Sequence, residues 1–395
     1  MMIGIKKIWS YRKGKWGLGI LFFFFMIACF ADFIANEKPV YCQFEGQGYF
    51  PVIHGYGEYL GLVSHYDFLN NRSWQDLELD NTIFPIIKFS PSNIDKGSTS
   101  FSPPGTIIRS SYAHKKHWLG SDSIGRDVAA GIIQGTRKTF LIAFFAMFIS
   151  CMIGMILGVL SGYFGDHYFK LNVWLVIVLA ILLFLSWFQY IYGHWSFVSS
   201  VIVSMVVIAG GSLASSKLGG KKISIPLDLI VMRVIEVFKS VPALFILLAL
   251  LAIIDRPSIL SLIIIIGLLR WSTIARILRA ELLALQEKKF IISARAIGAT
   301  DTQIVWKHLL PNAIPSLLTI IAFGFAGTIM IEATISFLGI GLSAEEVTWG
   351  SILSEARNNF SAWWLAVFPG SAIFLMVIAC NYIGDTLNEL SLSSD

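Results

Sequence analysis

Long apolar runs constrain this chain more than any other feature of its sequence. An α-helix needs about 20 apolar residues to cross the hydrocarbon core of a bilayer. Eight runs qualify, at residues 17–35, 139–161, 171–192, 195–213, 234–254, 258–278, 313–338 and 362–384. Hydrophobic residues make up 55% of the chain and charged residues 14%, against roughly a quarter in soluble domains. The sequence therefore predicts an all-α polytopic membrane protein with about eight transmembrane helices.

Charge placement predicts how these helices are oriented. The basic segment 1–16 precedes the run 17–35, which is longer than a signal-peptide core and lacks a small-residue cleavage site, so we expect a retained first helix. The polar region 36–138 then falls on the extracytoplasmic side of the membrane. Lys and Arg crowd the loops at 214–233 and 279–307, as cytoplasmic loops do. We expect a multi-pass protein of the inner (plasma) membrane with a cytoplasmic N-terminus and a cytoplasmic tail at 385–395.

Several kinds of chemistry have no sequence signal here. The four cysteines are scattered, so neither a disulfide framework nor a zinc spacing is present. His114 and His117 have a metal-like spacing, but they lack a third ligand and are expected to be solvated. The chain has no G-x-x-x-x-G-K-[ST] phosphate-binding loop. A net charge of +5 does not indicate nucleic-acid binding. We predict no catalytic residue, no metal site and no cofactor bound by this chain.

Three short motifs flank the apolar runs. The first, H-W-L-G-S-D-S-I-G-R-D at 117–127, precedes the second run. Its turn-forming and charged residues, with Arg126 able to pair with a carboxylate, are Gly120, Asp122, Gly125, Arg126 and Asp127. S-G-Y-F-G-D at 161–166 follows the second run, and M-R-V-I-E-V-F-K-S-V-P at 232–242 opens a later one.

The stretch I-S-A-R-A-I-G-A-T-D-T-Q-I-V-W-K-H-L-L-P from 292 to 311 is polar and helical between two apolar runs. Gly298 suits a left-handed helix end. Thr300 and Gln303 have the spacing of a capping box, which predicts a new helix start. Ala294, Ala296 and Gly298 would leave one face thin enough for close approach by a partner. The alternative is an amphipathic helix lying on the lipid surface.

Taken in order, these motifs resemble the dipeptide/oligopeptide/nickel family of ABC-importer permeases, and specifically its C-type subunit. The resemblance covers residues 115–165 and 228–390, and it identifies 280–311 as the EAA-type coupling loop, which docks on a separate ATPase. The coupling residues that it implies are Ser293, Ala294, Arg295, Ala296, Gly298, Ala299, Asp301, His308 and Pro311. The pattern departs at Ile292, where the family has Glu, and at Ser293, where it has Ala.

The resemblance also implies an architecture and partners. The permease domain spans 139–384, a six-helix type I importer core with an inserted helix pair at 171–213. A B-type permease would complete a heterodimer, ABC ATPase subunits would bind ATP and magnesium, and an extracytoplasmic binding protein would deliver the solute. Segments 31–39 and 48–51 look like the branch that handles oligopeptides and microcin C-type antibiotics. An ion-driven secondary transporter or a non-transporting membrane scaffold remains the alternative.

Three charged residues lie in or next to apolar runs. Glu332 stands in the run 313–338, and an intramembrane carboxylate is a functional-site hypothesis by default. It either lines the translocation path, pairs with an Arg of the partner permease, or is a snorkelling or hydrogen-bonded residue at the membrane interface. Arg270 and Arg276 are expected at the inner end of their helix, as cytoplasmic anchors.

Overall fold

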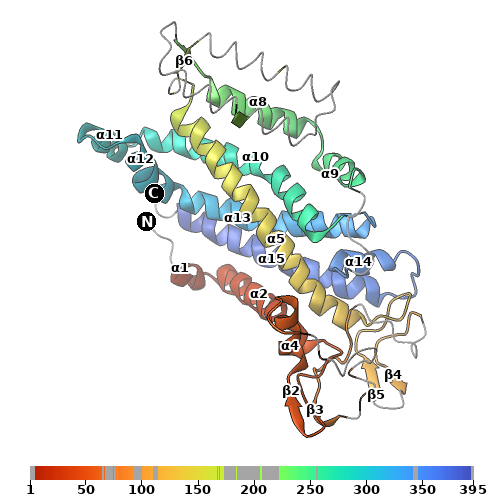
Figure 1. Ribbon diagram of the computed structural model, residues 1–395. Helices are drawn as coiled ribbons and strands as arrows, with labels where there is room; N and C mark the ends of the chain where they lie inside the picture. The colour runs from red at the N-terminus through yellow and green to blue at the C-terminus, as the bar shows by residue number, and fades with distance from the viewer. Residues whose placement is uncertain are drawn as a thin grey trace. The chain divides into compact units, whose positions relative to one another are not determined.

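The computed structural model describes residues 5–64, 66, 74, 77, 79–91, 100–109, 114–166, 168, 170–172, 184, 205–206, 222–254, 257–340 and 346–392. These residues are mostly helical (Figure 1). The helices are α1 Ile5–Ser10, α2 Arg12–Cys29, α3 Ala31–Ile34, α4 Pro51–Tyr59, α5 Val128–Val159, α8 Leu227–Ser240, α9 Ala243–Ala252, α10 Ile259–Gln286, α11 Lys289–Ala296, α12 Asp301–Gln303, α13 Leu310–Phe337, α14 Trp349–Glu355 and α15 Trp364–Leu392. Two π-helical turns, η2 Leu160–Phe164 and η3 Ile304–Leu309, adjoin α5 and α13.

Four helical segments in this part of the chain are long and apolar enough to cross a bilayer: Val128–Phe164, Ile259–Gln286, Asp301–Phe337 and Trp364–Ser391. The pair α8 and α9 would make a fifth if it counts as one span. The expected single helix at 234–254 is wrong, because Pro242 separates α8 from α9. Proline lacks the N–H that a helix interior needs, and it disfavours helical geometry in the residue before it.

The inserted helices expected at 171–192 and 195–213 lie almost wholly outside the described residues. At the first of them, residues 171 and 172 belong to a strand, β6 Lys170–Asn172. It pairs antiparallel with β7 Lys222–Ser224, with Lys170 opposite Ser224. This ladder brings together the two ends of the segment 173–221.

Short strands correct the expectation of an all-α chain. In the region before α5, β1 Tyr41–Phe44, β2 Gln47–Tyr49 and β3 Asp80–Ile83 form a sheet in the order β2-β1-β3. Glu45 and Gly46 join β1 to β2 with φ of 52° and 77°, and a two-residue hairpin turn with both φ positive matches the twist of the strands. A second hairpin pairs β4 Thr106–Arg109 with β5 His114–His117.

The chain forms two compact units. Unit 1 comprises residues 1–153, 241–274 and 311–395. Within it α2 lies alongside α15 (Figure 1). A Cβ on Gly17 would lie 2.8 Å from the Ala379 carbonyl and 3.0 Å from the Ile383 side chain, so only a glycine fits there. The ring of Phe24 packs edge-on against Trp349 at 5.6 Å between centroids. Close packing of this kind, rather than removal of apolar surface from water, holds membrane helices together.

Unit 2 comprises residues 154–240 and 275–310. Here the end of α5 crosses the second half of α10 closely, because a Cβ on Gly158 would lie 3.0 Å from the Leu278 side chain. Arg279 on α10 forms a two-pronged ion pair with Asp228 on α8. In this unit the C-terminal end of α5 and the N-terminal part of α8 therefore both contact the second half of α10.

The glycine contact between α5 and α10 in unit 1 should be sensitive to a larger side chain. A Cβ added at Gly267 would lie 2.9 Å from the Ile149 side chain, so a larger residue does not fit at this contact. Ser150 donates a hydrogen bond to the Gly267 carbonyl at 2.7 Å. Gly267→Leu forces these helices apart, and overpacking of this kind costs about 1–3 kcal/mol. We expect the melting temperature of the purified protein to fall by several degrees.

Gly370→Leu on α15 is the matched control, because a Cβ there meets nothing within 4 Å. Its melting temperature should stay near that of the unsubstituted protein. Equal melting temperatures for the two variants would contradict the close α5–α10 contact.

Candidate functional site

The connection between α10 and α13, residues 287–300, is built around one short helix and a glycine. The helix α11 ends where Gly298 adopts φ of +87°, a left-handed conformation that glycine reaches without strain. The N–H of Ala299 then donates to the carbonyl of Ala294 at 3.0 Å. The predicted left-handed end at Gly298 is confirmed.

The predicted capping box at Thr300 is also confirmed. The Gln303 N–H donates to the Thr300 hydroxyl at 3.4 Å, and the Thr300 N–H donates to the Gln303 side chain at 3.0 Å. From α12 the chain continues as one helix through η3 and α13 to Phe337. Pro311 and half-buried His308 therefore lie within a continuous helix, and the connection itself is shorter than the expected loop 280–311.

Burial defines which face of the connection a partner could reach. Ile291 and Ala294 are buried, the latter only 4% exposed, so the expectation that Ala294 contributes to an open thin face is wrong. Ile297 is instead 86% exposed, and Ile292 is exposed as well. Together with these two, the face consists of Ser293, Arg295, Ala296 and Gly298, and we call it the exposed face of the connection.

Tyr163 fixes this connection to the end of α5. Its hydroxyl donates to a carboxylate oxygen of Asp301 at 2.5 Å. The guanidinium of Arg295 lies over the Tyr163 ring, 5.8 Å from its centroid. Tyr168 bonds the same carboxylate, and this hydrogen bond raises the pKa of Tyr168. Asp301 is therefore an anchor between α12 and the turn after α5.

Gln286, the last residue of α10, completes the attachment. Its side-chain N–H donates to the Gly162 carbonyl at 2.7 Å, and its oxygen accepts a longer bond of 3.4 Å from Arg295. The sequence interpretation missed Tyr163 and Gln286 as site residues. The G-Y-F-G motif contained a signal, because Gly162 permits a close approach of the backbone, its Cβ position lying 3.0 Å from Arg279.

The outer motif at 117–127 shapes the chain just before α5. Gly120 has φ of +87°, and a Cβ there would lie 2.7 Å from the Trp364 indole nitrogen and 2.8 Å from the Ser102 carbonyl. Gly125 also has φ of +87°. Asp122 accepts the Arg126 N–H at 2.8 Å and its side-chain N–H at 2.6 Å, which confirms the predicted pairing of Arg126 with a carboxylate.

Asp127 caps the start of α5. One carboxylate oxygen accepts the Ala130 N–H at 2.7 Å, and the other lies 2.7 Å from Nδ1 of His117. Both side chains are fully buried, and Phe89 stacks on the imidazole at 4.5 Å. The expectation that His117 is solvated is therefore wrong. The motif is a structural support for α5 rather than an open surface.

Glu332 is closed off within unit 1. It is 1% exposed, and its carboxylate accepts bonds from the hydroxyls of Ser336 at 2.9 Å and Thr139 at 3.4 Å. This geometry matches the hydrogen-bonded structural alternative and does not place Glu332 on an open path. Among the described residues no group of side chains is suited to hold a metal ion.

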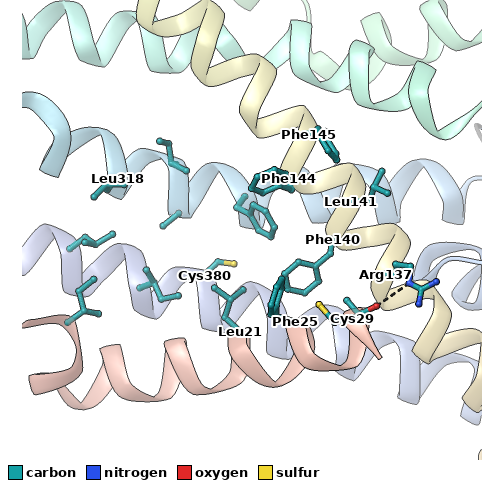
Figure 2. A pocket seen from close by; sticks show the side chains of 17 residues that line it. Leu21, Phe25, Cys29, Arg137, Phe140, Leu141, Phe144, Phe145, Leu318 and Cys380 are labelled. Carbon is teal, nitrogen blue, oxygen red and sulfur yellow. Dashed lines mark hydrogen bonds between the residues drawn. The ribbon is translucent and has the colours of Figure 1, made fainter. Parts of the chain in front are cut away.

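Unit 1 also contains an apolar cavity of about 750 Å³. Leu21, Phe25 and Cys29 line it from α2, facing a row of side chains on α5 that includes Phe140 and Phe144 (Figure 2). Arg137 lies at its edge but is engaged with the Ala28 carbonyl at 3.1 Å and with Asp32 at 2.7 Å. The cavity therefore suits hydrocarbon and offers no free charged group.

These observations describe a membrane permease: several apolar spans and an exposed helical connection, in a sequence without a phosphate-binding loop. Residues 206–392, just under half of the chain, match the model of the family described as binding-protein-dependent transport system inner membrane components. The chain is a permease subunit of an ABC importer in the inner membrane, and not an enzyme.

Relatives cover nearly the whole chain. The inner membrane ABC transporter permease protein YejE of Escherichia coli is 26% identical over 96% of this chain and 92% of its own. The peptidoglycan transport system permease protein YejE of Agrobacterium fabrum is 25% identical over 96% and 89%. The dipeptide transport system permease protein DppC of Alkalihalophilus pseudofirmus is 26% identical over 74% and 77%. The resemblance is confirmed, and the secondary-transporter and scaffold alternatives fall away.

The anchor at Tyr163 generates the second prediction. Tyr163→Phe keeps the ring beneath Arg295 but removes the bond to Asp301. One net hydrogen bond contributes about 1 kcal/mol, or roughly a fivefold change in an opening equilibrium. We expect amide exchange across 297–303 to rise about fivefold, measured by hydrogen–deuterium exchange in nanodiscs.

Two further variants make this measurement specific. Asp301→Asn keeps an acceptor oxygen for the Tyr163 hydroxyl, so its exchange should rise less than that of Tyr163→Phe. Thr302→Ala, at an exposed neighbouring position, should leave exchange unchanged. Unchanged exchange in Tyr163→Phe would rule out the anchor.

Proposed function

We propose that this chain is one half of a heterodimeric permease that imports peptides or peptide-like solutes. The observation that carries the substrate class is the set of relatives, whose names refer to dipeptide, glutathione and peptidoglycan transport. A B-type permease is the expected partner, with a separate binding protein to deliver the peptide outside the cell. Among the described residues, the cavity in unit 1 has no free polar group that would select one peptide.

The exposed face of the connection is the proposed docking site for the ATPase. It combines one bulky apolar group, Ile297, with the small residues Ser293, Ala296 and Gly298. Such a face fits a knob-in-cleft contact, since Ile297 projects while its neighbours let the partner's backbone approach. Arg295 supplies positive charge at its edge. The Glu of the family pattern is replaced by Ile292, so the contact rests on shape and on this one charge.

The same reasoning supports one orientation of the chain in the membrane. The connection must face the cytoplasm, where ATP is hydrolysed, and the α4 region and outer motif must then face outward. Eight spans, the number expected from the sequence, would place both termini in the cytoplasm. The basic residues of α2 support this orientation, because Arg12, Lys13 and Lys15 lie at its first turn.

Substitutions on the exposed face should uncouple ATP hydrolysis from transport. Arg295→Glu and Ile297→Asp each place a carboxylate in the proposed contact without touching the buried Ile291 and Ala294. We expect peptide uptake and binding-protein-stimulated ATP hydrolysis to fall at least tenfold in proteoliposomes. The purified variants should keep the melting temperature of the unsubstituted protein.

Arg357→Glu is the control, since it reverses a charge on an exposed residue outside the connection. It should leave uptake and stimulated ATP hydrolysis unchanged. Full uptake with both Arg295→Glu and Ile297→Asp would exclude this docking site. If neither an ATPase nor a second permease co-purifies with the unsubstituted chain, the whole proposal fails.

A further inference from the structure

Arg270 is a cation in the membrane-spanning part of unit 1. It lies near the middle of α10, and at about 1.5 Å per residue it is more than about 15 Å from either helix end. Its neighbours, Gly324 and Gly327, lie near the middle of α13. The expectation that Arg270 anchors the inner end of its helix is wrong, because α10 continues to Gln286.

The Arg270 side chain lies across α13 rather than reaching toward the membrane surface. A Cβ on Gly327 would lie 2.7 Å from Nη2 and 2.8 Å from Nη1 of Arg270. A Cβ on Gly324 would lie 3.9 Å from Nη2. The two glycines therefore form a slot that the guanidinium occupies. Long basic side chains near helix ends usually extend to the interface instead.

Two other arginines of the spanning helices have carboxylate partners, and Arg270 differs from them. Arg137 pairs with Asp32, and Arg279 pairs with Asp228. Arg276 also has no carboxylate partner among the described residues, but its side chain is exposed. Among the described residues, no carboxylate forms an ion pair with Arg270 and no acceptor takes a hydrogen bond from it. An unpaired charge in hydrocarbon is costly, and such residues mark substrate or ion pathways.

We propose that Arg270 binds the carboxylate of the transported peptide, an inference that rests on the proposed function. The guanidinium is a planar fork that matches a carboxylate with two parallel hydrogen bonds. Its side chain is only partly buried, so a solute can reach it. A free peptide has a terminal carboxylate whatever its sequence, so one fixed cation serves a mixed set of peptides.

The position of Arg270 also links peptide binding to the ATPase. The helix α10 that contains Arg270 ends at the connection, and the helix that contains Gly324 and Gly327 begins directly after it at Asp301. Both walls of the slot are therefore continuous along the chain with the connection.

The test compares peptides with and without a terminal carboxylate. The complex that co-purifies with this chain is reconstituted with its binding protein. It is then given a library of di- to hexapeptides made in two forms, free acid and C-terminal amide. Uptake of each form is quantified by mass spectrometry. The binding protein is the same for every variant, so its own preference cancels when acid-to-amide ratios are compared.

Three substitutions make the test specific. Arg270→Gln should lower the acid-to-amide uptake ratio about tenfold, because charge-assisted hydrogen bonds are the stronger kind. Gly327→Ala keeps the charge but displaces the flexible guanidinium, so it should lower the ratio less. Arg276→Gln, the same change on an exposed part of the same helix, should leave the ratio unchanged.

Two results would overturn the inference. An unchanged ratio in Arg270→Gln excludes recognition of the carboxylate, even if both forms enter more slowly. Equal loss of both forms, together with loss of the second permease from the complex, would assign Arg270 to a fixed acid of that subunit. If the unsubstituted complex imports neither form, the proposed function fails and the inference falls with it.

Discussion

The hydrogen bond from Tyr163 to Asp301 organises the part of this permease that we propose as the ATPase docking site. Asp301 begins the long helix through α13, and Tyr163 lies in the π-helical turn that ends α5. Gln286 adds a second attachment through the Gly162 carbonyl. The connection between α10 and α13 is therefore held on its inner side and open on its outer side. The connection that contains Ile297 is thus joined to the end of α5, to the end of α10 and to the helix that begins at Asp301, as the proposed coupling role requires.

Several charges within the spanning helices have a partner in their own unit. Arg137, Arg279 and Glu332 are each satisfied by a neighbour in their own unit, by carboxylates for the arginines and hydroxyls for the acid. Pairing removes most of the cost of placing a charge in hydrocarbon. Arg270 is half-buried and has no such partner among the described residues, and the glycines opposite make room for it. Arg276 has none either, but its side chain is exposed. A half-buried charge whose desolvation no partner offsets is expected to have a function in the membrane region.

Local chemistry could be predicted from the sequence where a single interaction decides it. The left-handed turn at Gly298, the capping box at Thr300 and the ion pair of Arg126 each depend on residues within a few positions of one another. Burial could not be predicted in the same way. The burial of Ala294 could not be predicted because α11 is too short for its apolar pattern to define a face. The burial of His117 could not be predicted because it depends on Asp127 and on the more distant Phe89, which enclose the ring.

The points where helices end could not be predicted from the sequence either. Hydropathy finds apolar composition but does not detect where a helix stops, so it merged α8 with α9 across Pro242 and ended α10 too early. The second error placed Arg270 at a helix end, when the polar continuation from Arg279 to Gln286 is still helical. Tertiary contacts, such as that of Gln286 with Gly162, stabilise this polar turn, and they join residues far apart in the sequence.

We propose that the ATPase binds the exposed face of the connection. Photo-crosslinking can test this: a benzoylphenylalanine is placed at Ile297, and at Phe374 on α15 as an exposed control. We expect light to attach the ATPase subunit to the chain from Ile297 and not from Phe374. Capture of lipid alone from Ile297, in a complex where the ATPase is present, would contradict it.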